Sequence, residues 1–477
     1  MRKILLLSAL LFHILTQAQT TETDAIIKRE MLERKIPGLQ VAVVQKGKIA
    51  FSKSYGTANI QDSIPVDNRS VFAINSITKV FTGVAIMQLV EKQLLSLSAP
   101  VSQYLDLPKQ WSGVTVRHLL THTSGLPDVL KLMDPQTGSL GSLKNEAAVW
   151  EKLISLPMEF APGEKFSYNQ TNGELLGKLI DKLTAQPFTD NFIQSQFRVA
   201  GMKNTVFGDS RDVIPHFAPT YFWRKYIDGR QLEKPVLVNN YYEFPQVRRT
   251  AAGLNSTAED IANWLITLQA GKLLSQSSLS EMWSPSTFNN GQPTPWALGW
   301  GMNKFRKKYR AVGMSGGGRA AFLLYPDDDL AIIVLTNLGG SYPEDFLEEI
   351  AGVYNKEIPK ADPVTNLRLT LRKIGFDKAI SFTQSEMKSN PLFRPNEFEL
   401  NEWAYRLMAK EQYKEALEIF KLNVYLFPNS GNAYDSYGEI LLKTGDKQNA
   451  IEMYKRSIAL DPNNEHGKKV LETLLKQ

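Results

Sequence analysis

Runs of apolar residues divide the first three quarters of the chain into strand-like segments at both ends and helix-like segments between them. Four strand-like segments form two pairs, each joined by a short polar turn: 39–44 with 49–55, and 320–325 with 330–336. Apolar runs on either side of such a turn predict β-hairpins. Four segments between the hairpins have the periodicity of helices: 78–94, 146–155, 174–183 and 258–269.

Strands at both ends of a region, with helices between them, predict an α+β domain with an antiparallel sheet flanked by helices. We assign this domain to residues 22–360 and expect both ends of the region to contribute strands to the sheet. The sequence Lys-Ala-Asp-Pro-Val at 360–364 predicts a linker to a second domain at 365–477.

The C-terminal region contains an internal repeat. Six small, apolar, aromatic and proline positions recur 34 residues later: Trp403, Ala404, Leu407, Ala416, Phe420 and Pro428 match Tyr437, Gly438, Leu441, Ala450, Tyr454 and Pro462. This pattern resembles the tetratricopeptide repeat, which implies an all-α array of helix pairs. Residues 365–390 are a candidate degenerate first unit, and 468–476 a candidate capping helix. Such an array either binds a protein partner or only packs on the neighbouring domain.

The N-terminus has the pattern of a secretory signal peptide. Arg2 and Lys3 precede an apolar run at 4–15, and Thr-Gln-Ala at 16–18 is a candidate cleavage site. We therefore predict a signal peptide at 1–18 and an exported protein, periplasmic or secreted. The alternative is an uncleaved anchor, although the apolar run is short for a bilayer. No transmembrane segment is expected after removal of the signal.

Composition excludes several kinds of site. The 477-residue chain has no cysteine, which rules out disulfides, thiol nucleophiles and cysteine-ligated metals. None of the five histidines forms an H-E-x-x-H pair, so we expect no dedicated metal site. We expect no organic cofactor either. The net charge of +6 is mild, and the lysine and arginine residues form no basic stripe with interleaved aromatic residues. We therefore expect no nucleic-acid partner.

A serine and a lysine three residues apart open one of the predicted helices. Ser76-Ile77-Thr78-Lys79 follows a strand-like stretch at 71–74. Backbone N–H groups at a helix N-terminus stabilise negative charge that develops on a serine. Lys79 lies over the same helix face as Ser76, and apolar surroundings that lower its pKa would let it accept the hydroxyl proton. The alternative is that Ser76 only caps the helix and Lys79 is a surface residue, because a capping serine and a surface lysine can have the same spacing.

Four further motifs follow in order. They are H-L-L-T-H-T-S-G-L-P at 118–127, F-A-P-G-E-K-F-S-Y-N-Q at 160–170, A-G-L-N-S-T-A-E-D at 252–260 and G-M-S-G-G-G at 313–318. Together with S-I-T-K, they resemble the serine β-lactamase-like hydrolases, the group of class C β-lactamases, D-alanyl-D-alanine carboxypeptidases and esterases. The resemblance covers residues 25–345 and implies a β-lactamase/transpeptidase-like fold.

The resemblance also implies a set of catalytic residues. Ser76 would be the nucleophile that forms an acyl-enzyme, and Lys79 its first proton acceptor. Tyr168 matches the tyrosine of the family's Y-x-N motif, which shuttles protons to the leaving group. The backbone N–H groups of Ser76 and Gly317 would form the oxyanion hole, because the glycines at 316–318 let a strand edge approach a ligand closely.

Two positions depart from the family pattern. Gln170 replaces the asparagine of Y-x-N, and its longer amide can still hydrogen-bond a substrate. Met314-Ser315-Gly316 replaces the K-T-G motif, which is often H-x-G in esterase-like members, and Met314 brings neither charge nor proton donor. We expect this loss to weaken carboxylate recognition by about 10- to 100-fold. Arg319 and the basic cluster at 306–310 are candidate substitutes for the missing cation.

His122, in the L-L-T-H-T-S-G segment, is interpreted as a structural residue. The serine, lysine and tyrosine already provide proton transfer, so a catalytic histidine is not required.

These patterns predict an exported serine hydrolase that acts by acyl-enzyme formation on an ester, amide or peptide-like substrate. The alternative is a catalytically silent binding protein that senses a cell-wall peptide or a partner. Gln170 and Met314 favour the binding protein, whereas the intact Ser76, Lys79 and Tyr168 favour the enzyme.

Overall fold

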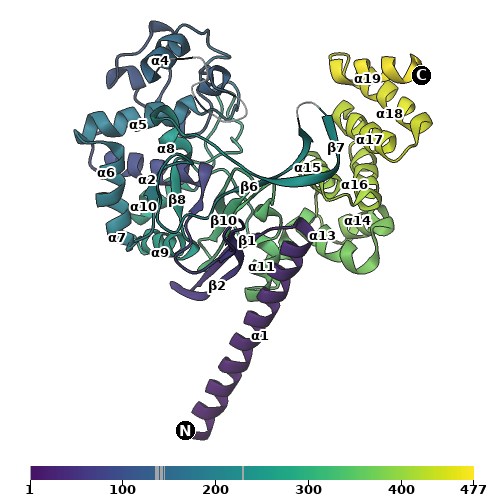
Figure 1. Cartoon of the computed structure of the whole chain (residues 1–477), viewed down its shortest axis with the longest axis horizontal. Helices are drawn as coiled ribbons and strands as arrows, with labels where there is room; N and C mark the ends of the chain where they lie inside the picture. Colours follow the sequence, from purple (N-terminus) through teal and green to yellow (C-terminus); the bar gives the residue numbers. More distant parts are fainter. Residues whose placement is uncertain (1, 135–138, 140–142, 144, 228–229, 477) are drawn as a thin grey trace. The chain divides into compact units, whose positions relative to one another are not determined.

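A computed structural model describes residues 2–134, 139, 143, 145–227 and 230–476 (Figure 1). The chain divides into two compact units, Met1–Ala351 and Gly352–Gln477, and the boundary falls within helix α11 (Leu347–Tyr354). The segment predicted as a linker, 360–364, is instead the junction of helices α12 (Glu357–Ala361) and α13 (Pro363–Ile374). Asp362 is the N-cap of α13, because its side chain accepts the N–H of Thr365. Pro363 is the first residue of the helix, a position that proline favours.

The first unit contains a six-stranded antiparallel sheet with the strand order β3-β2-β1-β11-β10-β9. Its strands are β1 (Gly38–Gln45), β2 (Lys48–Asn59), β3 (Ile64–Pro65), β9 (Val312–Gly316), β10 (Ala320–Tyr325) and β11 (Leu330–Thr336). The predicted hairpins are β1–β2 and β10–β11, and β1 pairs with β11, so both ends of the region complete one sheet. The predicted α+β fold class is confirmed.

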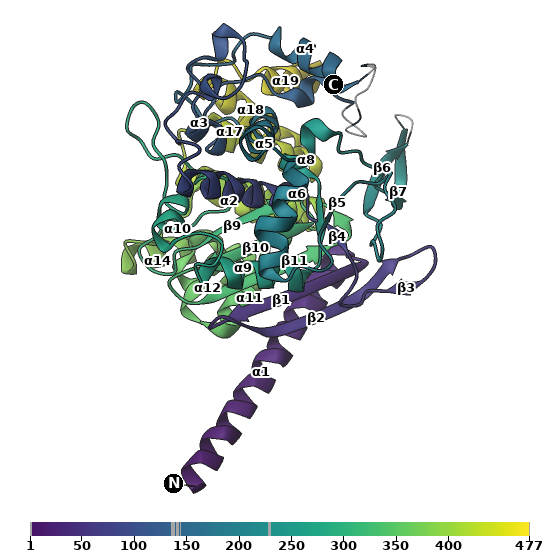
Figure 2. The same cartoon turned by 90° about the vertical axis from the view of Figure 1, so that its left-hand side faces the viewer.

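Both faces of the central strands are covered. Every residue of β10 and β11 is buried, which explains why their sequences are continuous apolar runs without polar alternation. On one face, alternate strand residues join the main core, against which α9 (Ala258–Gln269) packs. On the other face, the Tyr325 hydroxyl contacts Glu348 of α11, beside the C-terminal half of α1 (Arg2–Arg34; Figure 2).

The four predicted helices are present, with shifted ends in all but α9: α2 (Thr78–Glu91), α4 (Glu146–Ile154), α5 (Thr171–Thr184) and α9. Shorter helices of this unit are α3 (Val116–Leu120), α6 (Phe188–Phe192), α7 (Arg198–Ala200), α8 (Gln246–Ala252) and α10 (Gln276–Met282). Two small sheets have the orders β12-β6-β7 and β4-β8-β5. Their strands are β4 (Phe72–Ala73), β5 (Val206–Phe207), β6 (Tyr221–Ile227), β7 (Arg230–Asn239), β8 (Leu254–Ser256) and β12 (Leu338–Gly339).

Helix α1 runs through the predicted signal peptide, of which Met1 lies outside the described residues. A continuous helix does not report on cleavage, so the signal peptide at 1–18 stays a prediction. Within the described part of the chain, no helix is both long enough and apolar enough to cross a membrane.

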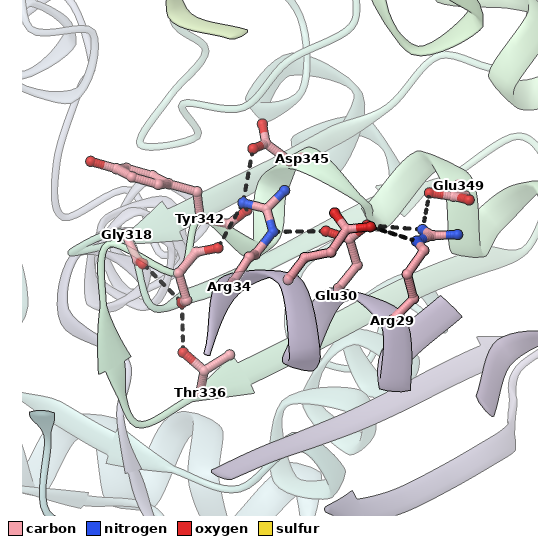
Figure 3. Close-up of polar contacts among 10 residues, drawn as sticks. Arg29, Glu30, Arg34, Gly318, Thr336, Tyr342, Asp345 and Glu349 are labelled. Atoms are coloured by element: carbon pink, nitrogen blue, oxygen red, sulfur yellow. Dashed lines mark hydrogen bonds and ion pairs between the residues drawn. The ribbon is translucent and has the colours of Figure 1, made fainter. Parts of the chain in front are cut away.

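Ion pairs attach the C-terminal turns of α1 to the segment that follows β11 (Figure 3). Arg34 pairs with Glu30 at 2.7 Å and with Asp345 at 3.1 Å, and Arg29 pairs with Glu349 of α11 at 2.7 Å. The side chains of Arg34 and Glu30 are almost completely buried. Removing one partner of such a pair would leave an uncompensated buried charge, so these contacts hold α1 firmly against the first unit.

The same segment holds the turn between β9 and β10 in place. Arg34 donates to the carbonyl of Ser341 at 2.9 Å, and Ser341 Oγ donates to the carbonyl of Gly318 at 3.1 Å. The N–H of Tyr342 donates to that same Gly318 carbonyl at 2.9 Å. Contacts therefore lead from α1 to the turn that carries Gly317 (Figure 3).

In the second unit, the 34-residue repeat forms two helix pairs. The first pair is α15 (Glu397–Ala409) with α16 (Tyr413–Leu426), and the second is α17 (Gly431–Lys443) with α18 (Lys447–Leu460). In the described part of this unit, α12, α13 and α14 (Ala379–Ser389) precede the pairs, and α19 (Glu465–Lys476) follows them. Ala416 and Ala450 are fully buried, as expected for small residues at close helix contacts.

Candidate active site

Ser76 lies in a turn that leads directly from a strand into a helix. Strand β4 ends at Ala73, a single 3₁₀ turn spans Asn75–Ile77, and α2 begins at Thr78. Asn75 has φ +45°, a left-handed conformation that asparagine adopts more readily than most residues. The turn places Ser76 beside the N-terminal end of α2, where the helix dipole favours negative charge.

Ser76, Lys79 and Tyr168 come together in space. The Tyr168 hydroxyl donates to Ser76 Oγ at 2.8 Å, and Lys79 Nζ donates to the same oxygen at 3.3 Å. Lys79 Nζ also lies 4.7 Å from the centroid of the Tyr168 ring. Tyr168 is 37% exposed and Lys79 only 5%, so the serine is accessible from the tyrosine side while the lysine is enclosed.

Lys79 is held by three acceptors at the base of the site. Besides Ser76 Oγ, its Nζ donates to Gln170 Oε1 at 2.9 Å and to the carbonyl of Ala251 at 2.8 Å. Burial lowers the pKa of Lys79 below that of an exposed lysine. The lowered pKa favours the neutral amine, which is the form able to accept a proton from a serine.

Gly316 and Gly317 bring the end of β9 against the turn that carries Ser76. A Cβ on Gly316 would lie 2.0 Å from the Ile74 carbonyl oxygen and 3.2 Å from the Ser76 nitrogen, so only glycine permits this approach. Gly317 has φ +59°, and a Cβ there would lie 2.2 Å from Asn75 Nδ2. The N–H groups of Ser76 and Gly317 thus belong to two segments in close contact.

Met314 and Ser315, the other two predicted substrate-binding residues, lie on β9 itself. Met314 is 3% exposed and belongs to the main core, whereas Ser315 is half-buried. A buried thioether supplies no charge, so position 314 provides no cation for a substrate carboxylate.

His122 has the contacts of a structural residue. Its Nδ1 accepts the N–H of Asn169 at 3.1 Å and lies 3.0 Å from Asn172 Nδ2. Its ring centroid is 4.6 Å from that of Tyr168 and 5.0 Å from that of Trp296. Burial holds the pKa of His122 well below its usual value, so the imidazole is neutral and its Nδ1 is already used as an acceptor. These contacts position Tyr168.

Asp128 belongs to the site but was not among the predicted residues. Its Oδ1 accepts the N–H of Gln170 at 3.2 Å and that of Leu130 at 3.0 Å, which fixes the start of α5. Burial raises the pKa of its carboxyl group. Asp128 directly follows the S-G-L-P motif, and that position is the only sequence signal for it.

Arg248 is the second residue that sequence analysis missed. Its guanidinium lies 5.1 Å from the Phe244 ring centroid and interacts electrostatically with Asp128, Tyr168 and Lys79. It therefore adds a positive charge that acts on Lys79 and Tyr168. No motif marks Arg248, because only the packing of α8 brings it here.

Comparison with known proteins identifies the family. The family profile described as Beta-lactamase matches residues 23–352. The chain belongs to the β-lactamase family. Membership places it among hydrolases related to β-lactamases and penicillin-binding proteins. A Tetratricopeptide repeat profile matches residues 431–464, which contain α17 and α18, and this match confirms the second of the two predicted repeat units.

Relatives within the β-lactamase family are distant. Protein flp of Staphylococcus aureus (strain MW2) is 26% identical over 385 residues, which cover 76% of this chain and 74% of that protein. Penicillin-binding protein 4* of Bacillus subtilis (strain 168) is 29% identical over 310 residues, 62% of this chain and 67% of that protein. The octameric penicillin-binding protein homologue from Pyrococcus abyssi shares the fold, with a TM-score of 0.58, 24% identity and coverage of 72% and 81% of the two chains.

Proposed function

We propose that the protein is an exported serine hydrolase that forms an acyl-enzyme on Ser76 with an ester, amide or peptide-like substrate. The observation that carries the proposal is the convergence on Ser76 Oγ of the Tyr168 hydroxyl at 2.8 Å and Lys79 Nζ at 3.3 Å. A nucleophile within reach of two proton-transfer groups is the arrangement that nucleophilic catalysis requires.

Acylation begins when neutral Lys79 accepts the hydroxyl proton of Ser76. The serine oxygen attacks the substrate carbonyl carbon, and the N–H groups of Ser76 and Gly317 stabilise the oxyanion. Tyr168 passes a proton to the leaving group, which departs and leaves the acyl group on the serine. Water then attacks the acyl-enzyme, with the same residues transferring the proton in the reverse direction.

Two further parts of the proposal rest on sequence features. Export rests on the charged and apolar pattern of residues 1–18. A protein partner for the helix pairs rests on the Tetratricopeptide repeat match at 431–464.

Covalent labelling of Ser76 tests the function. The protein without residues 1–18 is incubated with a fluorophosphonate or, separately, with a penicillin, because two relatives carry the name of penicillin-binding proteins. We expect a single adduct by intact-mass spectrometry that is lost in Ser76→Ala. Ser385→Ala is the matched control, since Ser385 and Lys388 have the same spacing in the second unit. Folded protein that forms no adduct with either reagent would favour the catalytically silent binding protein.

Replacing Arg248 with glutamine should move the acidic limb of the pH–rate profile to higher pH. Burial is the main cause of the lowered pKa of Lys79, and the charge of Arg248 lowers it further. Without that charge the pKa of Lys79 rises, so less of the amine is neutral at a given pH. The measurement is kcat/KM for 4-nitrophenyl butyrate as a function of pH. Arg249→Gln, whose guanidinium pairs with Asp212 at 3.4 Å, should keep the original profile; an unmoved limb in Arg248→Gln would contradict the assignment.

A further inference from the structure

The turn between β9 and β10 has two consecutive glycines with positive φ. Gly317 has φ +59° and Gly318 has φ +61°, and the N–H of Arg319 closes the turn by donating to the carbonyl of Gly316 at 3.1 Å. Glycine reaches such conformations without steric cost, but it populates others as readily. Contacts from outside the turn are therefore needed to fix the direction of the Gly317 N–H.

The segment that follows β11 supplies these contacts. The Gly318 carbonyl accepts the N–H of Tyr342 at 2.9 Å and the hydroxyl of Ser341 at 3.1 Å. The next carbonyl, that of Arg319, accepts the N–H of Thr336 at 2.8 Å. Thr336 Oγ1 lies 2.7 Å from Ser341 Oγ, so the two hydroxyl groups are in hydrogen-bond contact. Ser341 is fully buried, and its hydroxyl is a side-chain link from this segment to the glycine turn.

Arg34 of α1 holds the backbone of the same segment. Its Nη1 donates to the carbonyls of Ser341 at 2.9 Å and Tyr342 at 3.4 Å, and it pairs with Asp345 at 3.1 Å (Figure 3). Tyr342 has φ +47°, a strained conformation for a bulky residue that persists only where surrounding contacts fix it. The guanidinium of Arg34, bound to two successive carbonyls, provides contacts of this kind.

The ion pairs that orient Arg34 are buried. The side chains of Arg34, Glu30 and Asp345 are 5%, 0% and 3% exposed. Apolar residues of similar volume often stabilise a fold as well as a buried ion pair does, because burying the charges is costly. Stability alone therefore does not account for this cluster, whereas a need to hold the backbone at Ser341 in a defined position does.

We propose that Ser341 is a positioning residue for the oxyanion hole, and that Arg34 acts on the hole through Ser341. Arg34 fixes the backbone at Ser341, the Ser341 hydroxyl fixes the Gly318 carbonyl, and this carbonyl sets the direction of the preceding Gly317 N–H. The inference rests on the proposed function, because that N–H is the group that stabilises the oxyanion. Misplacing such a donor by about 1 Å is enough to lower a rate by about 100-fold.

Ser341→Ala tests the positioning role by kinetics. The substitution removes one donor to the Gly318 carbonyl and leaves the Tyr342 N–H in place. We expect kcat for 4-nitrophenyl butyrate to fall about 10- to 100-fold with KM within about twofold, because oxyanion donors act chiefly on the transition state. The inhibition constant of phenylboronic acid should rise by a similar factor, because its tetrahedral adduct on Ser76 places an oxygen among the same N–H groups. The acidic limb of the pH–rate profile should not move, because other acceptors hold Lys79.

Two further variants separate positioning from folding. Ser195→Ala is the matched control, because Ser195 Oγ also donates to a backbone carbonyl, that of Asn191 at 2.7 Å, and it should keep the parental kcat. Arg34→Lys keeps a positive charge beside the acidic partners but loses the planar fork that also reaches the Ser341 carbonyl, so it should lower kcat in the same way. Thermal unfolding shows which variants are folded at the assay temperature. If Ser341→Ala is not folded, Arg34→Lys decides the question.

A measurement on the turn itself does not depend on activity. Protein made with glycine that carries carbon-13 at the carbonyl and nitrogen-15 gives selective NMR signals for amides that follow another glycine, those of Gly317, Gly318 and Gly340. We expect one sharp Gly317 signal in the parent and in Ser195→Ala. In Ser341→Ala the Gly317 signal should be split or broadened, because the glycine turn then has more than one conformation.

The outcomes distinguish the positioning role from the proposed function. If the parent is active and folded Ser341→Ala keeps both its kcat and a single sharp Gly317 signal, the positioning role is wrong and the proposed function stands. Lower thermal stability with unchanged kcat would show a purely structural role for Ser341. A Gly317 signal that splits in Ser341→Ala supports the positioning role even if no reagent labels Ser76, and the proposed function alone then fails.

Discussion

Replacing Lys79 with methionine should lower kcat/KM for 4-nitrophenyl butyrate by about 100- to 10,000-fold, the range for loss of a general base. Methionine keeps most of the buried volume, so the expected loss reflects proton transfer. The pKa of Lys79 is lowered by burial, and the neutral amine is what the first step uses. The labelling rate of Ser76 by a fluorophosphonate should fall in parallel, because acylation of the serine is the step affected.

A second substitution separates proton transfer from charge. Lys79→Arg keeps a positive charge near Ser76 but cannot release a proton near neutral pH, so it should not restore activity. Lys92→Met, an exposed lysine at the other end of α2, is the matched control and should retain full activity. Near-normal rates in Lys79→Arg would show that the site needs only a cation at this position.

The sheet could be predicted because its central strands are bounded by strong turn signals. The aspartates at 327–329 separate two apolar runs, and these runs are the whole of β10 and β11. The β6–β7 hairpin could not be predicted in the same way, because charged residues interrupt its sequence and much of its described surface is exposed. Strand β6 pairs with β12 as well as with β7, and no local pattern reveals the pairing with β12.

The candidate site shows where motifs stop being informative. Their spacing and the resemblance identified Ser76, Lys79 and Tyr168, yet only the fold shows that Tyr168 donates to the serine. The motif comparison predicted that Gln170 binds substrate, whereas in the structure its amide oxygen accepts a hydrogen bond from Lys79. Arg248 had no signal at all, since a charge acts through space and its position depends on the packing of α8.

The glycine turn is as important for this mechanism as the side chains around it. Gly316→Ala would place a Cβ 2.0 Å from the Ile74 carbonyl oxygen, so β9 must move away from the turn that carries Ser76. This movement separates the N–H groups of Ser76 and Gly317. Loss of one oxyanion donor lowers kcat by about 100- to 1,000-fold, and we expect a decrease of this size for 4-nitrophenyl butyrate.

Gly113→Ala is the matched control for this substitution. A Cβ on Gly113 would come no closer than 4.0 Å to its nearest neighbour, Pro162, so kcat should be unchanged. Thermal unfolding of both variants separates local displacement from loss of the fold. If the oxyanion hole is formed as proposed, Gly316→Ala remains folded at the assay temperature but loses kcat more than it changes KM, because the donors act chiefly on the transition state. A folded Gly316→Ala with kcat within twofold of the parent would place the oxyanion donors elsewhere.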